Sequence, residues 1–181
     1  KSRYRLPPGT DTLTYGEWLV GNYVDEFDVP TGEKHIFLLA EHYAKGHQQQ
    51  PLSLERITIS SLSDRKPEPV IRIDSKDTMI RLAKSVWLSY RVIGGDMDGL
   101  RVQDFYVSDE EIYAYSGSYT ISIGERKSDR DRFLHTMMDA LATGSDVELS
   151  IRTNEGYSSN YILPGEGFGW AASQLFDVSS P

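Results

Sequence analysis

Tyrosines are the residues whose number and spacing most clearly suggest chemistry in this sequence, and that chemistry is binding. The chain has 11 Tyr among 181 residues, and Tyr113, Tyr115 and Tyr119 share one parity within residues 112–123. On a single strand, three such rings would form a row on one sheet face. Exposed Tyr rings bind sugars, peptides or proteins because they offer contact area at little entropic cost. We therefore predict a partner-binding row at Tyr113, Tyr115 and Tyr119; the alternative is a half-buried face that Tyr covers well.

Histidines and carboxylates offer weaker candidates for a metal site. His42 and His47 flank a polar loop beside Glu41, but this spacing matches no standard zinc motif. Asp96 and Asp98 resemble part of a calcium loop, yet the full ligand pattern with a late bidentate Glu is missing. We therefore expect no metal ion and no other cofactor.

No sequence motif indicates an enzyme. The chain lacks a G-x-S-x-G nucleophile elbow and a glycine-rich phosphate loop, and the absence of Cys excludes thiol nucleophiles, disulfides and thiolate zinc sites. Asp109, Glu110 and Glu111 are sequence neighbours, whereas paired catalytic acids face each other across a cleft. A hydrolase with a dispersed site, in which His42 or His47 approaches an aspartate, is kept as an alternative.

Charge restricts the class of partner. Lys and Arg total 19 and Asp and Glu total 27, which gives a formal net charge of −8. An acidic surface disfavours binding to nucleic acid and to anionic lipid. No apolar run approaches the roughly 20 residues of a membrane helix. The same acidity suits an inhibitor or immunity protein that captures a basic enzyme or toxin, which is a further alternative.

Alternation of apolar and polar residues along most of the chain predicts short strands. Strands are predicted near residues 17–23, 35–40, 52–59, 70–74, 86–93, 102–107, 147–151 and 157–163. A turn is predicted at residues 30–32 and a hairpin-like turn at residues 75–77. Gly117 indicates a bulge or tight hairpin within 112–123. The fold class expected is mainly β, an antiparallel sandwich or partial barrel.

Two helices are expected late in the chain. The first spans about 129–143, with Ser128 and Asp131 resembling a capping box and Gly144 as the stop. Its apolar stripe consists of Phe133, Leu134, Met137, Met138 and Leu141. A short C-terminal helix is expected at 168–176. Residues 1–14 are interpreted as a flexible lead-in and residues 15–181 as a single β-rich domain.

The two ends of the chain resemble the invasion-associated locus B family and related bacterial envelope domains. The residues that carry the resemblance are Tyr15-Gly16-Glu17-Trp18-Leu19-Val20, the segment from Phe133 to Gly144, Val147-Glu148-Leu149, Gly156, Tyr161-Ile162-Leu163-Pro164-Gly165, Gly167-Phe168, Ala171-Ala172 and Leu175. The family's usual cysteines are absent here. The resemblance implies an exported protein, periplasmic or outer-membrane-associated.

The leading hypothesis is therefore a non-enzymatic, exported envelope protein that binds a protein or another envelope macromolecule through a sheet face or edge. The recognisable motifs belong to the scaffold, and no catalytic constellation accompanies them. The sequence does not indicate the oligomeric state.

Overall fold

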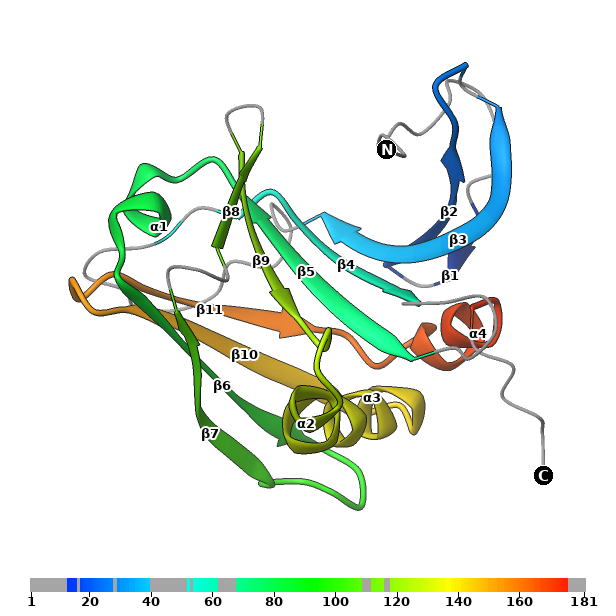
Figure 1. Ribbon diagram of the computed structural model, residues 1–181. Coiled ribbons are helices and arrows are strands. Elements are labelled where there is room, and N and C mark those ends of the chain that lie inside the picture. The colour runs from blue at the N-terminus through cyan, green and yellow to red at the C-terminus, as the bar shows by residue number, and fades with distance from the viewer. Residues whose placement is uncertain are drawn as a thin grey trace.

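The chain forms two antiparallel β-sheets that face each other across an apolar core (Figure 1). The computed structural model describes residues 13–15, 17–27, 29–39, 52, 54–61, 68–108, 112–115 and 118–175. Strands dominate this part of the chain, and the sheets do not close into a barrel. The predicted mainly β class is confirmed, in its sandwich form rather than as a partial barrel.

The larger sheet has seven strands in the order β1-β2-β3-β4-β5-β9-β8. Their bounds are β1 (Leu13–Tyr15), β2 (Trp18–Val24), β3 (Pro30–Leu39), β4 (Arg56–Ser61), β5 (Pro69–Ser75), β8 (Ile112–Tyr115) and β9 (Ser118–Ile123). The smaller sheet has the order β11-β10-β6-β7. Its strands are β6 (Ser85–Ile93), β7 (Arg101–Ser108), β10 (Asp146–Thr153) and β11 (Ser158–Leu163).

Alternating side chains from both sheets fill the core, as the period-2 pattern predicts. The smaller sheet contributes Val86, Leu88, Tyr90, Val92, Phe105, Val107, Val147, Leu149, Ile151, Tyr161 and Leu163. The larger sheet contributes Trp18, Val20, Ile36, Leu38, Ile57, Ile59, Ile71, Ile73, Ile121 and Ile123. Burying a Val, Leu or Ile side chain stabilises the fold by roughly 1.5–3 kcal/mol, so this alternation decides which face of each strand is available for binding.

A helical run over residues 127–142 fills one end of the sandwich and contacts β5 of the larger sheet and β6 and β10 of the smaller one. It consists of α2 (Lys127–Asp129), the π-helical turn η3 (Arg130–Leu134) and α3 (His135–Ala142). The predicted apolar stripe is confirmed, with Met138 partly buried. The predicted capping box is wrong, because the helix begins at Lys127 and Asp131 pairs with Lys127 instead of the first-turn amides.

The π-helical turn contains an arginine that the sequence analysis did not identify. Arg130 is only 6% exposed. Its Nη1 donates to the Gly124 carbonyl at 2.6 Å, and its Nη2 lies 2.8 Å from Glu68 Oε2. This guanidinium therefore joins the start of the helical run to the chain segment that enters β5.

A contact between β2 and α4 (Phe168–Ser173) joins the two ends of the chain. Trp18 is fully buried, its Nε1 donates to the Pro164 carbonyl at 2.6 Å, and its ring meets Phe168 edge-on at a centroid distance of 5.0 Å. The C-terminal helix was predicted at residues 168–176, and α4 ends three residues earlier, at Ser173. The aromatic residues that carry the family resemblance thus meet in space, while membership of that family stays a prediction.

Two glycines allow the chain to reach α4. A Cβ at Gly165 would lie 2.3 Å from the Ser145 carbonyl oxygen, so only glycine fits this close approach, and its amide donates to Asp146 Oδ1 at 3.0 Å. Gly167 has a φ of +80° as the N-cap of α4, a conformation that glycine adopts without strain. The turn before α4 therefore depends on both residues.

Three local expectations were wrong. Residues 30–32 belong to β3, since Val24 pairs with Pro30 and the turn precedes it. Residues 75–77 lead into α1 (Thr78–Leu82), because the Asp77 carboxylate accepts from the Met79 amide at 2.9 Å and caps this helix. Leu13 and Thr14 of the expected lead-in form β1 and pair with β2. The remaining lead-in, residues 1–12, lies outside the described residues.

We expect Trp18→Phe to lower the free energy of unfolding by about 2 kcal/mol or more, because it leaves the Pro164 carbonyl without its donor and a space beside Phe168. Urea unfolding measures this loss. Trp170→Phe is the matched control, since Trp170 on α4 is 72% exposed and its replacement should change stability by less than about 0.5 kcal/mol. Equal losses in the two variants would contradict the role assigned to Trp18.

Candidate functional site

The predicted tyrosine row does not form, because its residues lie on two strands. β8 and β9 are a hairpin in which Tyr113 pairs with Thr120, whereas Tyr119 pairs with Ala114. Directly paired residues share a sheet face, so Tyr113 and Tyr119 point to opposite faces. Tyr113 is 49% exposed, but Tyr119 is 9% exposed and belongs to the core. Tyr115 has the same parity as Tyr113 on β8. Gly117, for which a bulge or a tight hairpin was predicted, lies outside the described residues.

The other residues considered from the sequence do not assemble into a site in the described part of the chain. Glu41, His42, His47 and residues 109–111 lie outside the described residues. The Asp98 carboxylate accepts from the Gly94 amide at 2.7 Å, which closes the turn between β6 and β7. Among the described residues, no group of three or more His, Asp or Glu side chains could hold a metal ion.

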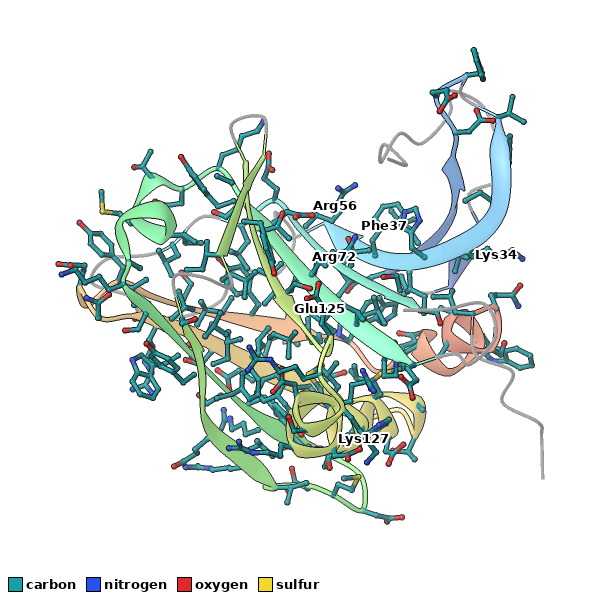
Figure 2. All side chains as sticks on the ribbon, in the orientation of Figure 1. Lys34, Phe37, Arg56, Arg72, Glu125 and Lys127 are labelled. Atoms are coloured by element: carbon teal, nitrogen blue, oxygen red, sulfur yellow. The ribbon has the colours of Figure 1, made fainter. Side chains whose placement is uncertain are left out.

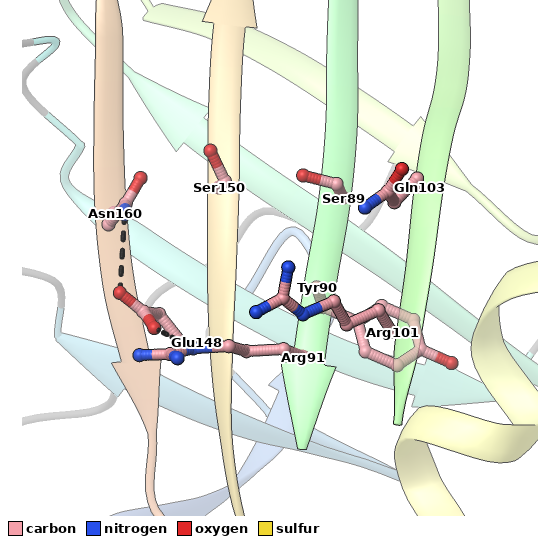
Figure 3. Close-up of a pocket in the computed structure, with 8 residues that line it drawn as sticks. All are labelled: Ser89, Tyr90, Arg91, Arg101, Gln103, Glu148, Ser150 and Asn160. Carbon is pink, nitrogen blue, oxygen red and sulfur yellow. Dashed lines mark hydrogen bonds and ion pairs between the residues drawn. The ribbon is translucent and has the colours of Figure 1, made fainter. Parts of the chain in front are cut away.

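The outer face of the smaller sheet carries three rows of polar and aromatic side chains across its four strands. The strand register sets the rows, because directly paired residues have Cβ atoms about 4.5–5.5 Å apart. From β11 to β7, one row reads Ser158, Arg152, Trp87 and Tyr106; the next reads Asn160, Ser150, Ser89 and Gln103; the third reads Ile162, Glu148, Arg91 and Arg101. The register shifts between Leu88 and Tyr90, so Ser89 has no single partner on β7, and Gln103 lies beside it (Figure 3).

Two of these rows line a depression of about 340 Å³, shown in Figure 3. We define the polar trough as Ser89, Arg91, Arg101, Gln103, Glu148, Ser150 and Asn160, which line it together with Tyr90. Serines occupy the middle of the sheet, and longer side chains stand along the third row. The small serine side chains therefore form the floor, and the amides of Asn160 and Gln103 stand at its two ends.

Charged groups on one side of the polar trough are held in place by short contacts. Arg91 Nε lies 2.6 Å from Glu148 Oε2, and Asn160 Nδ2 donates to Glu148 Oε1 at 3.2 Å. The Arg101 side chain extends from β7 toward β6 (Figure 3). Arg101 forms no ion pair with any described residue, so its guanidinium has donors available for a ligand.

An aromatic row borders the polar trough along the strands. Trp87 and Tyr106 meet edge-on with ring centroids 4.9 Å apart, and Tyr106 is 46% exposed. Trp87 and Arg152 also line a second depression of about 530 Å³ beside the β10–β11 turn, together with Tyr157 and Ser158. The smaller sheet thus combines hydroxyls, amides, guanidinium groups and aromatic rings on one open face.

Part of this site is already indicated by the sequence pattern of β6. The alternation in residues 86–93 assigns Val86, Leu88, Tyr90 and Val92 to the core, which leaves Trp87, Ser89 and Arg91 facing outward. The missing information was the partner strand and its register. Only these place Arg152, Ser150 and Glu148 beside them.

The outer face of the larger sheet differs, because its outward side chains are covered around β3 and β4. His35, Phe37, Thr58 and Ser60 point away from the core, yet each is less than 5% exposed. Figure 2 shows Phe37 and Arg56 on this side of the sheet. The rings of His35 and Phe37 stack at 5.3 Å. Burial, helped by the nearby Arg56 charge, lowers the pKa of His35 to about 4.

We expect His35 to make the fold sensitive to acid. Its pKa in the folded state is about 4 and its ordinary value is 6.5, so between these values only the unfolded chain takes up the proton. The free energy of unfolding should therefore fall by about 3 kcal/mol as the pH drops from about 6.5 to 4. In urea unfolding at pH 7 and pH 4, His35→Gln should lose less stability than the wild type. His135→Gln, at an exposed histidine, should behave like the wild type, and an identical acid response of all three proteins would refute the assignment.

Arg91 and Arg130 provide a test of which arginine is structural. The Arg91 side chain is 50% exposed, so we expect Arg91→Gln to change the free energy of unfolding by less than about 1 kcal/mol. The Arg130 side chain is 7% exposed, and Arg130→Gln should cost about 3 kcal/mol or more because it leaves Glu68 and the Gly124 carbonyl without their donor. Thermal and urea unfolding of both variants measure the difference. A large loss for Arg91→Gln would show that the polar trough is a structural network.

Comparisons of the chain with protein-family models, with curated proteins and with solved structures find no match. Within the described part of the chain, no helix has the length and apolar character needed to cross a membrane.

Proposed function

We propose that this protein is an exported binding domain that holds a macromolecular partner on the outer face of its smaller sheet. The observation that carries the proposal is the polar trough, an open depression to which four adjacent strands contribute side chains. Its outward residues are not needed for the core, which the alternate positions of the same strands fill. A rigid sheet that presents hydrogen-bonding groups at fixed spacing is suited to recognition.

The arrangement of the face also supports binding over catalysis. Arg91, Glu148 and Asn160 bind one another across neighbouring strands, and the side chains that line the polar trough include one carboxylate and no histidine, so no pair of acid and base groups faces a ligand there. Recognition needs only fixed donors, acceptors and contact area. The alternatives of a hydrolase with a dispersed site and of an acidic inhibitor stay predictions. The arginines of this face favour an acidic partner, whereas an inhibitor of a basic toxin would need an acidic face.

Export to the periplasm or outer membrane is part of the proposal. Its support is the resemblance of the segments around Trp18 and Phe168 to the envelope family. A partner in the cell envelope, either a protein or another macromolecule, is therefore the class to search first.

The proposal is tested by placing a bulky side chain in the polar trough and measuring whether the protein still binds its partner. Immobilised wild-type protein, Ser150→Tyr and Ser122→Tyr are incubated with a bacterial envelope extract, and the bound macromolecules are identified. Ser150 is on the trough floor, whereas Ser122 on β9 belongs to the larger sheet, so both variants carry the same change on different sheets. We expect a partner that binds the wild type and Ser122→Tyr but loses at least tenfold in affinity for Ser150→Tyr.

A third variant separates the polar trough from the tyrosine hairpin. Tyr113→Ala removes the exposed ring of β8 and leaves the smaller sheet unchanged. Loss of the partner in Tyr113→Ala together with full binding by Ser150→Tyr would move the binding site to the hairpin. Thermal unfolding of each variant confirms that the comparison is made between folded proteins.

A further inference from the structure

Arginines outnumber carboxylates among the described side chains on the outer face of the smaller sheet. The three rows contain Arg91, Arg101 and Arg152 and one described carboxylate, Glu148. Asp146, at the start of β10, also faces outward and accepts from the Gly165 amide. The chain as a whole has a formal charge of −8. Glu148 is already engaged by Arg91 and Asn160. An acidic group on a ligand would therefore find local attraction here, although the rest of the protein repels polyanions.

The floor of the polar trough offers side-chain groups and no strand edge. β6 and β10 are inner strands whose backbone hydrogen bonds are taken up by neighbours on both sides. An extended peptide that binds by adding a strand needs an exposed edge, which this floor lacks. The ligand of the trough must consequently be recognised through hydroxyl, amide and guanidinium groups.

Those groups match the chemistry of a sugar. Ser89, Ser150, Asn160 and Gln103 each provide both a donor and an acceptor, as does every sugar hydroxyl. Trp87 and Tyr106 supply rigid aromatic area beside the trough, against which the apolar C–H face of a sugar ring can pack. The available donors of Arg101 suit a carboxylate, to which guanidinium binds in a planar, bidentate way.

From this juxtaposition we infer that the polar trough and the adjoining aromatic row bind an acidic oligosaccharide, one that carries carboxylates at intervals among neutral sugars. Neighbouring strands are about 4.8 Å apart, so four strands present a surface long enough for several sugar rings. Arg101 binds a carboxylate, the serines and amides bind hydroxyls, and Trp87 and Tyr106 support a ring. The inference rests on the proposed function and specifies its ligand.

Calorimetric titration of the full chain with three probes tests the inference. The first is a hexasaccharide of alternating glucuronic acid and N-acetylglucosamine, the second is the neutral hexamer of N-acetylglucosamine, and the third is hexaglutamate. We expect the acidic hexasaccharide to bind at least tenfold more tightly than either of the others. Raising the salt concentration should reduce this preference over the neutral hexamer.

Two variants and a control assign the contacts. Arg101→Gln should weaken the acidic hexasaccharide about tenfold and leave the affinity for the neutral hexamer within twofold. Tyr106→Ala should weaken both saccharides. Arg132→Gln removes an exposed arginine of the helical run, which is not part of the trough, and should change neither affinity.

Three results would overturn the inference. Equal affinity for both saccharides with no effect of Arg101→Gln would remove the acidic specificity. Tighter binding of hexaglutamate would identify a peptide as the ligand, and no binding of any probe would exclude a saccharide of this kind. In the last two cases the proposed function still stands if Ser150→Tyr loses the envelope partner that Ser122→Tyr retains. If Ser150→Tyr retains that partner, the proposed function fails as well.

Discussion

The pairing of β6 with β10 is the constraint on which both the core and the candidate site depend. Eight residue pairs, from Asp146 with Ile93 to Thr153 with Val86, fix this register. The side-chain period of a strand is two, so a slip of β10 by one residue against β6 would turn Leu149 to the solvent and Glu148 to the core. The apolar residues prevent this slip because exposing them is costly. The same cost therefore holds the polar trough in place.

The helical run and the buried Arg130 stabilise the sandwich around this strand pair. The helical run closes one end of the sandwich, where Phe133 meets Tyr90 and Phe105 at ring-centroid distances of 5.0 and 4.9 Å. Tyr90 lies directly beneath the polar trough, and burial raises the pKa of its hydroxyl to about 12, so it stays neutral. The buried Arg130 joins this helix to the larger sheet. A candidate binding face on such a support keeps its groups at fixed spacing, which would limit the entropy lost on binding a ligand.

The positions of Tyr113, Tyr115 and Tyr119 show why a sequence pattern alone can predict a site in the wrong place. Parity within residues 112–123 puts Tyr113, Tyr115 and Tyr119 on one face only if the stretch is a single strand. The structure divides this stretch into β8 and β9. Odd-numbered residues of β8 share a face with even-numbered residues of β9, as the pairing of Tyr113 with Thr120 shows. Tyr119 then pairs with Ala114 and turns into the core. The register between β8 and β9 therefore makes Tyr119 a core residue, although its parity in the sequence predicted a contact with a partner.

The sequence by itself determined the mainly β class, most strands, the apolar stripe of the helical run and the inward residues of β6 and β10. These follow from local periodicity, which any stretch of chain expresses without knowledge of its neighbours. Only the tertiary structure decided which strands pair, that Trp18 meets Phe168 and that Ser89, Ser150 and Asn160 lie in one row. These contacts join residues far apart in the chain, and their register is set by the simultaneous burial of both sheets. For that reason the sequence alone predicted the scaffold, whereas the candidate binding face depends on how the folded sheets pair their strands.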